Sequence, residues 1–327
     1  MAAEGTRRGS LPTRRELLRT AALTTVVAPL LAACDIRLED DAPTLPLIQR
    51  KSVPDEAVLV DLVRRTTALA QAAGRVPNPN DAVSRLANIH QTQADVLRSR
   101  LTTAGVPNHV IDGSTASTTT ASTTAPTAAV SAPPQTTPQD VAAAETALVA
   151  AVLPALPTVT AANRAVVASV VASCGAAAEL LGATVNWPAA DPLPPAAAVP
   201  LLDGTRSAAY AFQVVAAQTG GDQRAVAEGT HTDLDSRATE LAGMAGSSAP
   251  VGPLGYALPY PVTAPDVASR LAGQVLTTLV AGGLAPLATL PEGSTATTTL
   301  VRLLVDAQRL GRTWGVAPVP FPGQAYP

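Results

Sequence analysis

Residues 160–181 read TAANRAVVASVVASCGAAAELL, and this stretch decides the class of fold. Its larger apolar side chains recur three or four residues apart, as Val166, Val170 and Cys174 do. That spacing places them on one face of a helix, whereas the apolar residues of a half-buried strand would alternate with polar ones. We therefore expect a helix over residues 160–181 whose valine face packs into a core.

The same helical period recurs along most of the chain, so the sequence predicts an all-α protein. The expected helices are approximately Asp55–Ala73, Asp81–Ala104, Gln139–Leu153, Thr160–Leu181, Leu201–Gln218, Asp222–Ala245, Pro265–Leu290 and Thr297–Trp314. Hydrophobic residues make up 47% of the chain but aromatic residues only 2%, so the core must consist of alanine, valine and leucine. Small side chains bury little apolar area each, at ~25 cal/mol per Å², and favour close helix packing.

Two antiparallel four-helix bundles in tandem are the simplest arrangement of these helices, and one eight-helix body is the main alternative. The predicted divisions are a first bundle at 54–182, a proline-rich linker at 183–199, a second bundle at 200–316 and a tail at 317–327. Residues 112–138, inside the first bundle, are almost entirely Ser, Thr, Ala and Pro. Such a composition buries too little apolar surface to offset its ordering entropy, which predicts a disordered loop.

The first 34 residues have the order of a signal peptide: a charged stretch, an apolar run and small residues. Arg14 and Arg15 resemble the paired arginines of the twin-arginine export signal. Leu31-Ala32-Ala33-Cys34 resembles the bacterial lipobox. The apolar run, Ala21 to Leu31, is shorter than the roughly 20 residues of a spanning helix.

These resemblances imply that residues 1–33 are removed and that lipid on Cys34 becomes the membrane anchor. Residues 34–53 would then form a tether, and the helical body would lie on the outer face of the cytoplasmic membrane. Two acyl chains give stable anchoring, at ~0.8 kcal/mol per buried CH₂ group.

The charge of the predicted mature chain argues against nucleic-acid binding. Removing residues 1–33 takes five of 22 basic and two of 25 acidic residues, which leaves a net charge of −6. Lys51 is the only lysine, so no basic stripe is present that could neutralise phosphates.

The second half resembles the ferritin-like domain of unknown function found in exported actinobacterial proteins. The resemblance rests on Tyr256-Ala257-Leu258-Pro259-Tyr260-Pro261-Val262 between two helices, and on Trp314 and Phe321-Pro322-Gly323 near the end. It covers about residues 199–323 and implies a ferritin-like four-helix bundle. The first half looks like a more distant relative with the same helix plan.

Ferritin-like relatives often hold two metal ions, with two lone Glu and two Glu-x-x-His pairs on four helices. Here Glu228 and His231 form one such pair. Its companions are missing, because Thr205-Arg206 stands where related sequences tend to carry Glu-His and Asp306 falls off the apolar stripe. We therefore expect no bound metal or other cofactor, with Glu228 and His231 as weak metal candidates.

His90 and Glu145 both fall on inward helix faces of the first bundle. An inward carboxylate costs several kcal/mol unless it is paired. We therefore predict that the two side chains form a buried polar pair with a structural role. Cys174, among valines and alanines, is expected to behave as a small inert hydrophobe.

No complete catalytic arrangement is visible in the sequence, which favours a binding protein over an enzyme. The leading expectation is a membrane-anchored envelope lipoprotein whose helices bind a partner protein or a small apolar ligand. A ferritin-like metal-binding or redox protein is the alternative. The binding component of a transporter is a third hypothesis. It is less favoured because such proteins are usually α/β and this chain lacks strand patterns.

Overall fold

The computed structural model describes residues 50–113 and 136–324. Every regular element within these ranges is a helix, so the predicted all-α class is confirmed. The α-helices are α3 (Glu56–Gly74), α4 (Asp81–Thr103), α5 (Asn108–Asp112), α6 (Pro138–Val152), α7 (Ala161–Leu180), α8 (Pro195–Gln218), α9 (Gly221–Ala245), α10 (Pro265–Gly282) and α11 (Ala296–Thr313). The 3-10 helices are η1 (Leu153–Thr158), η2 (Gly246–Ser248) and η3 (Ala285–Thr289).

Side-chain caps fix the start of two helices in the first half. The Asn80 side chain accepts a hydrogen bond from the Val83 backbone N–H at 2.9 Å and begins α4. At α6, Thr137 and Asp140 accept from each other's backbone N–H and form a capping box. Pro138 fits the first helical position because its missing N–H would have had no partner there.

Asp55 directly precedes α3, but its side chain forms no cap there and stabilises a different helix. Its carboxylate accepts hydrogen bonds from the backbone N–H and hydroxyl of Thr160 and from the Asn163 amide, at the start of α7. Partial burial raises the pKa of Asp55, but these hydrogen bonds and the charge of Arg164 outweigh it and leave the pKa below its usual value. The carboxylate therefore links the start of α3 to the start of α7.

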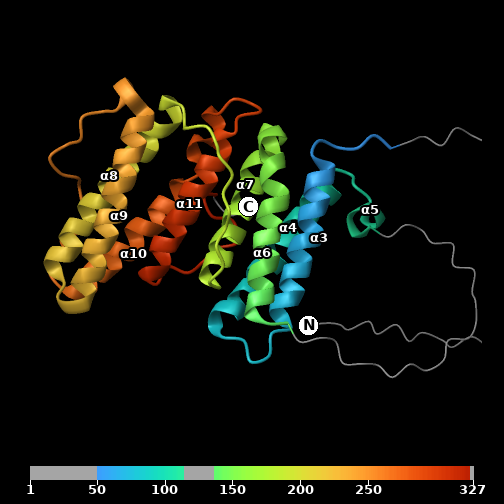
Figure 1. Cartoon of the computed structure of the whole chain (residues 1–327), viewed down its shortest axis with the longest axis horizontal. Coiled ribbons are helices and arrows are strands. Elements are labelled where there is room, and N and C mark those ends of the chain that lie inside the picture. The colour runs from blue at the N-terminus through green and yellow to red at the C-terminus, as the bar shows by residue number, and fades with distance from the viewer. Residues whose placement is uncertain (1–49, 114–135, 325–327) are drawn as a thin grey trace, which may run out of the picture. The chain divides into compact units, whose positions relative to one another are not determined.

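Helix α7 lies at the centre of the unit that begins at Ser52. It packs on α6 and α11, while α3 packs on α4 and α6, and α8 packs on α9 and α10. In Figure 1, α7 and α11 lie between α8–α10 on one side and α3, α4 and α6 on the other. One apolar cluster accordingly contains residues from both halves, from Leu59 to Phe321. A second, smaller cluster centres on Phe212 in the second half.

Small residues let the neighbours of α7 approach closely. A Cβ atom at Gly175 would lie 3.0 Å from Cγ2 of Val305 and 3.3 Å from the ring of Trp187. Most of α7 is buried, as a core made of alanine, valine and glycine requires. The quoted sequence stretch thus forms the helix that joins the two halves.

Three differences separate the observed helices from the expected ones. Helix α8 begins at Pro195, inside the predicted linker 183–199, because proline is tolerated in a first helical turn. The expected helix Pro265–Leu290 ends as α10 at Gly282 and resumes as η3, since Gly283 and Pro286 interrupt it. The short helix α5 was not expected.

The segment 317–327, expected to be a tail, is ordered as far as the structure describes it. Phe321 is 3% exposed and belongs to the larger core cluster. Ser169 on α7 donates a hydrogen bond to the Pro322 carbonyl at 2.7 Å. The end of the second half therefore packs against the first half.

Candidate functional site

A buried polar cluster lies between α4, α6 and α7. Nε2 of His90 lies 2.5 Å from Oε1 of Glu145, and both side chains are 0% exposed. The structure thus brings together the two residues that the helical pattern placed on inward faces.

The hydrogen bonds of Gln93 determine which ring nitrogen of His90 carries a proton. Its amide nitrogen donates to the Pro320 carbonyl at 2.6 Å, and a carbonyl can only accept. The amide oxygen of Gln93 must then face Nδ1 of His90, 2.9 Å away, so Nδ1 carries a proton. Nε2 is left to interact with Glu145.

One proton lies between His90 and Glu145. Without it, two lone pairs would meet at 2.5 Å in the core. With it, the pair is either imidazolium and carboxylate or imidazole and carboxylic acid, and both forms have no net charge. Burial lowers the pKa of His90, but the charge and hydrogen bond of Glu145, with the hydrogen bond of Gln93, raise it above the ordinary value.

Cys174 completes the cluster, and the sequence did not predict its place there. One donor atom each from His90, Glu145 and Cys174 lies within 4.8 Å of the other two, and all three residues are buried. Burial and the nearby carboxylate raise the pKa of the Cys174 thiol well above its usual value. Although the thiol is close to the carboxylate, Oε2 of Glu145 has no partner in hydrogen-bond geometry among the described residues.

Glu228 and His231, the weak metal candidates, lie on α9 away from this cluster. Glu228 is exposed, and Nε2 of half-buried His231 lies 3.5 Å from the Gln213 amide nitrogen, while its Nδ1 has no hydrogen-bond partner among the described residues. Asp306 forms an ion pair with Arg237 instead of facing them. Among the described residues, the His90–Glu145–Cys174 group is the one set of three or more possible ligands within reach of each other.

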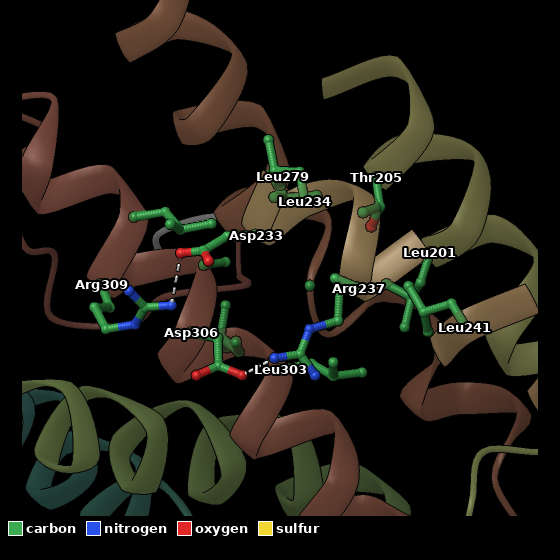
Figure 2. Close-up of a pocket in the computed structure, with 14 residues that line it drawn as sticks. Leu201, Thr205, Asp233, Leu234, Arg237, Leu241, Leu279, Leu303, Asp306 and Arg309 are labelled. Carbon is green, nitrogen blue, oxygen red and sulfur yellow. Dashed lines mark hydrogen bonds and ion pairs between the residues drawn. The ribbon is translucent and has the colours of Figure 1, made fainter. Parts of the chain in front are cut away.

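A charged cleft separates α9 from α11. Figure 2 shows Arg237 of α9 directed at Asp306 of α11, and Arg309 of α11 directed at Asp233 of α9. Leucines from α8 to α11 line the space behind these ion pairs, which measures about 50 Å³. That volume holds a few water molecules and is too small for an organic ligand.

An apolar groove of about 530 Å³ runs between α8, α10 and the segment at 257–259. This volume is within the range of small-molecule sites. The lining residues are Pro200, Leu201, Gly204, Ser207, Ala208, Ala257, Leu258, Pro259, Gln274, Val275, Thr278, Leu279 and Gly282. None is charged, and three carry polar side chains.

Five aromatic residues of the second half contact one another or an arginine, and none of them is among the residues that line this groove. Tyr210 contacts Tyr256, with ring centres 6.1 Å apart, and Phe212 contacts Trp314 edge-on at 5.3 Å. The Arg270 guanidinium lies 4.8 Å above the centre of the Tyr260 ring. The proline-rich segment that carries the ferritin-like resemblance therefore forms one wall of the groove through Ala257, Leu258 and Pro259.

Arg14, Arg15 and Cys34 lie outside the described residues, and so do residues 114–135 of the predicted loop. Three described stretches are long and apolar enough to span a membrane by length and composition: Pro138–Thr158, Ala161–Leu180 and Pro265–Thr289.

In the stretch Ala161–Leu180, 83% of the apolar window is buried inside the protein, so packing accounts for its hydrophobicity. The windows of the other two are 44% and 39% buried. Helix α6 exposes mainly alanine, and α10 exposes polar Arg270, Gln274 and Thr277. In α10 the apolar face thus packs inward and polar residues face outward, which is the pattern of an amphipathic helix.

Comparison with known proteins found no match for this chain among family models, curated proteins or solved structures. The fold and the geometry of these sites are therefore the basis for a functional conclusion.

Proposed function

We propose that this protein is a lipid-anchored, extracytoplasmic binding protein that takes a small apolar ligand in the groove between α8 and α10. The observation that carries the proposal is the groove itself, about 530 Å³ with no charged residue in its lining. Ser207, Gln274 and Thr278 supply the few polar groups that would orient a ligand, as is usual in such sites.

The resemblance at the N-terminus supports the location. Arg14 and Arg15 would direct export, and Cys34 would carry the acyl chains. The polar stretch that follows Cys34 is long enough to hold the helical body clear of the lipid surface. An anchored binding protein would keep its groove close to apolar molecules that leave or enter the membrane.

The finer architecture belongs to the same proposal. We infer two antiparallel four-helix bundles of the ferritin-like plan, α3–α4–α6–α7 and α8–α9–α10–α11, that share the contact between α7 and α11. Support comes from the packing of α3 on α4, α6 on α7, α8 on α9 and α10 on α11. The second bundle lacks the paired carboxylates of a two-metal site, so we propose that its helices bind an apolar ligand instead of metal ions.

Filling the groove is expected to weaken ligand binding at least about tenfold. A side chain at Gly204 would meet no atom within 4 Å of its Cβ, so Gly204→Leu fits the folded protein and occupies the groove. Gly229→Leu is the matched control, since Gly229 is an equally open helical glycine on α9. Either change should stabilise its helix by about 0.5–1 kcal/mol.

The measurement is the fluorescence of N-phenyl-1-naphthylamine, an uncharged apolar probe, titrated with the purified chain. Wild type and Gly229→Leu should bind one probe per chain with equal affinity, and Gly204→Leu should bind at least about tenfold more weakly. Equal binding by all three proteins would exclude the groove as the ligand site.

Replacing Cys34 by serine is expected to release the protein from membranes, because serine cannot form the thioether to diacylglycerol. The test is fractionation of a bacterium that processes lipoproteins and expresses the full chain. Wild type should sediment with membranes, and Cys34→Ser should be found in the soluble extracytoplasmic fraction. The double change Arg14→Lys and Arg15→Lys should instead keep the chain in the cytoplasm. Wild-type protein that is soluble and unacylated would refute the anchor.

A further inference from the structure

The buried cluster of the first half has three kinds of ligand atom on three helices. His90 on α4 offers nitrogen, Glu145 on α6 oxygen and Cys174 on α7 sulfur, with one such atom from each residue inside a 4.8 Å span. The ferritin-like plan instead uses paired Glu-x-x-His motifs, so this cluster is a different kind of site.

The hydrogen bonds around His90 match those of a metal-bound histidine. Metal-bound imidazoles usually donate their other N–H to a neighbouring oxygen, which fixes the ring and its tautomer. Nδ1 of His90 donates to the Gln93 oxygen, and Gln93 is held in turn by the Pro320 carbonyl. Nε2 is therefore directed into the cluster.

Glu145 has more acceptor capacity than its surroundings use. Oε1 meets His90, whereas Oε2 is buried with no hydrogen-bond partner among the described residues. A buried acceptor without a partner is destabilising because its lost hydration is not replaced, and more so when the group is charged. A cation beside Oε2 would remove this destabilisation.

We propose that His90, Glu145 and Cys174 bind one divalent transition-metal ion of the zinc class inside the first half of the chain. The mix of nitrogen, oxygen and sulfur donors fits Zn²⁺ and does not fit Mg²⁺ or Ca²⁺, which prefer oxygen alone. Three protein ligands leave one position of a tetrahedral ion open.

The charges balance in both states of the cluster. Without metal, one proton is shared by His90 and Glu145 and another remains on the thiol, so the net charge is zero. Metal binding forms bonds to Nε2, a carboxylate oxygen and Sγ, and both protons leave to solvent. A divalent ion, a thiolate, a carboxylate and a neutral imidazole again sum to zero, so neither state buries net charge. Nε2 and Oε1 must move apart from 2.5 Å for both to bind one ion.

The experiment uses the full chain with Cys34→Ser, so that Cys174 is the only thiol. After chelation and removal of the chelator, Co²⁺ alone is titrated near neutral pH, followed by Zn²⁺. We expect one Co²⁺ per chain, a thiolate-to-cobalt charge-transfer band, about two protons released per ion and displacement of Co²⁺ by Zn²⁺.

Two variants in this background locate the ion. Cys174→Ser should lose the charge-transfer band and bind Co²⁺ at least about tenfold more weakly. His231→Gln should bind as the background protein does, because His231 lies in the other half. Circular dichroism checks the fold of each variant.

The folded background protein decides the proposal even if Cys174→Ser does not fold. Absence of a thiolate band in that protein overturns the site, as does Co²⁺ binding without proton release. A band that survives Cys174→Ser overturns it as well. The groove plays no part in these measurements, so their outcome is independent of the proposed ligand-binding function.

Discussion

Replacing His90 by leucine is expected to lower the free energy of unfolding of the metal-free protein by about 3–5 kcal/mol. The change leaves Glu145 fully buried with neither oxygen hydrogen-bonded by an imidazole, since Oε2 has no partner in the first place. Nearby Cys174 offers only a weak S–H donor. Denaturant unfolding with a chelator present measures the effect and excludes a contribution from metal.

Two further variants separate charge from shape. Glu145→Gln keeps the shape of the side chain and can donate an amide N–H to Nε2, so its cost should be about 1 kcal/mol. The double variant His90→Leu with Glu145→Leu should recover much of the loss, because no unpaired charge remains in the core. If His90→Leu alone cost less than about 1 kcal/mol, the pair would contribute little to stability.

Eight of the nine described α-helices were predictable because apolar residues recur along them at helical spacing. Their ends were less so. Pro195 was read as part of a linker, although a proline at the first helical position of α8 loses no hydrogen bond. Asp55 was expected as the first residue of a helix, whereas its side chain bonds to Thr160 and Asn163, which are more than 100 residues away in sequence. Local propensity holds no information about such distant contacts.

The candidate site was predictable to a similar extent. Inward faces identified His90 and Glu145, but not their relative height along the bundle, which depends on how α4 and α6 pack. Cys174 also lay on a predicted inward face, and the same missing height kept it apart from the pair. The groove could not be predicted, because its walls come from α8, α10 and the segment at 257–259, and only packing places them together.

The contact between α7 and α11 implies that the two halves unfold together even if each is built as its own four-helix bundle. The larger core cluster contains residues of both halves. The C-terminal segment adds two hydrogen bonds to the first half, from Gln93 to Pro320 and from Ser169 to Pro322. A change deep in the second half should therefore destabilise the first half as well.

Phe212→Ala is the change that tests this coupling, and it is expected to cost about 3–5 kcal/mol. Phe212 is fully buried in the second-half cluster and packs edge-on against Trp314, so its loss leaves a cavity. The two tryptophans report on different places, since Trp187 packs against Gly175 of α7. Trp187→Phe and Trp314→Phe each leave one reporter.

Phe212→Ala should lower the midpoint of denaturant unfolding by the same amount whether Trp187 or Trp314 reports it, as a single cooperative unit requires. The physical reason is that opening the second half would expose the α7 surface that α11 covers, including the small residues around Gly175. If the unfolding midpoint reported by Trp314 fell while the midpoint reported by Trp187 did not change, the two halves would be independent domains. In that case the contact between α7 and α11 would be weaker than its burial implies, and each half would have to be stable without the other.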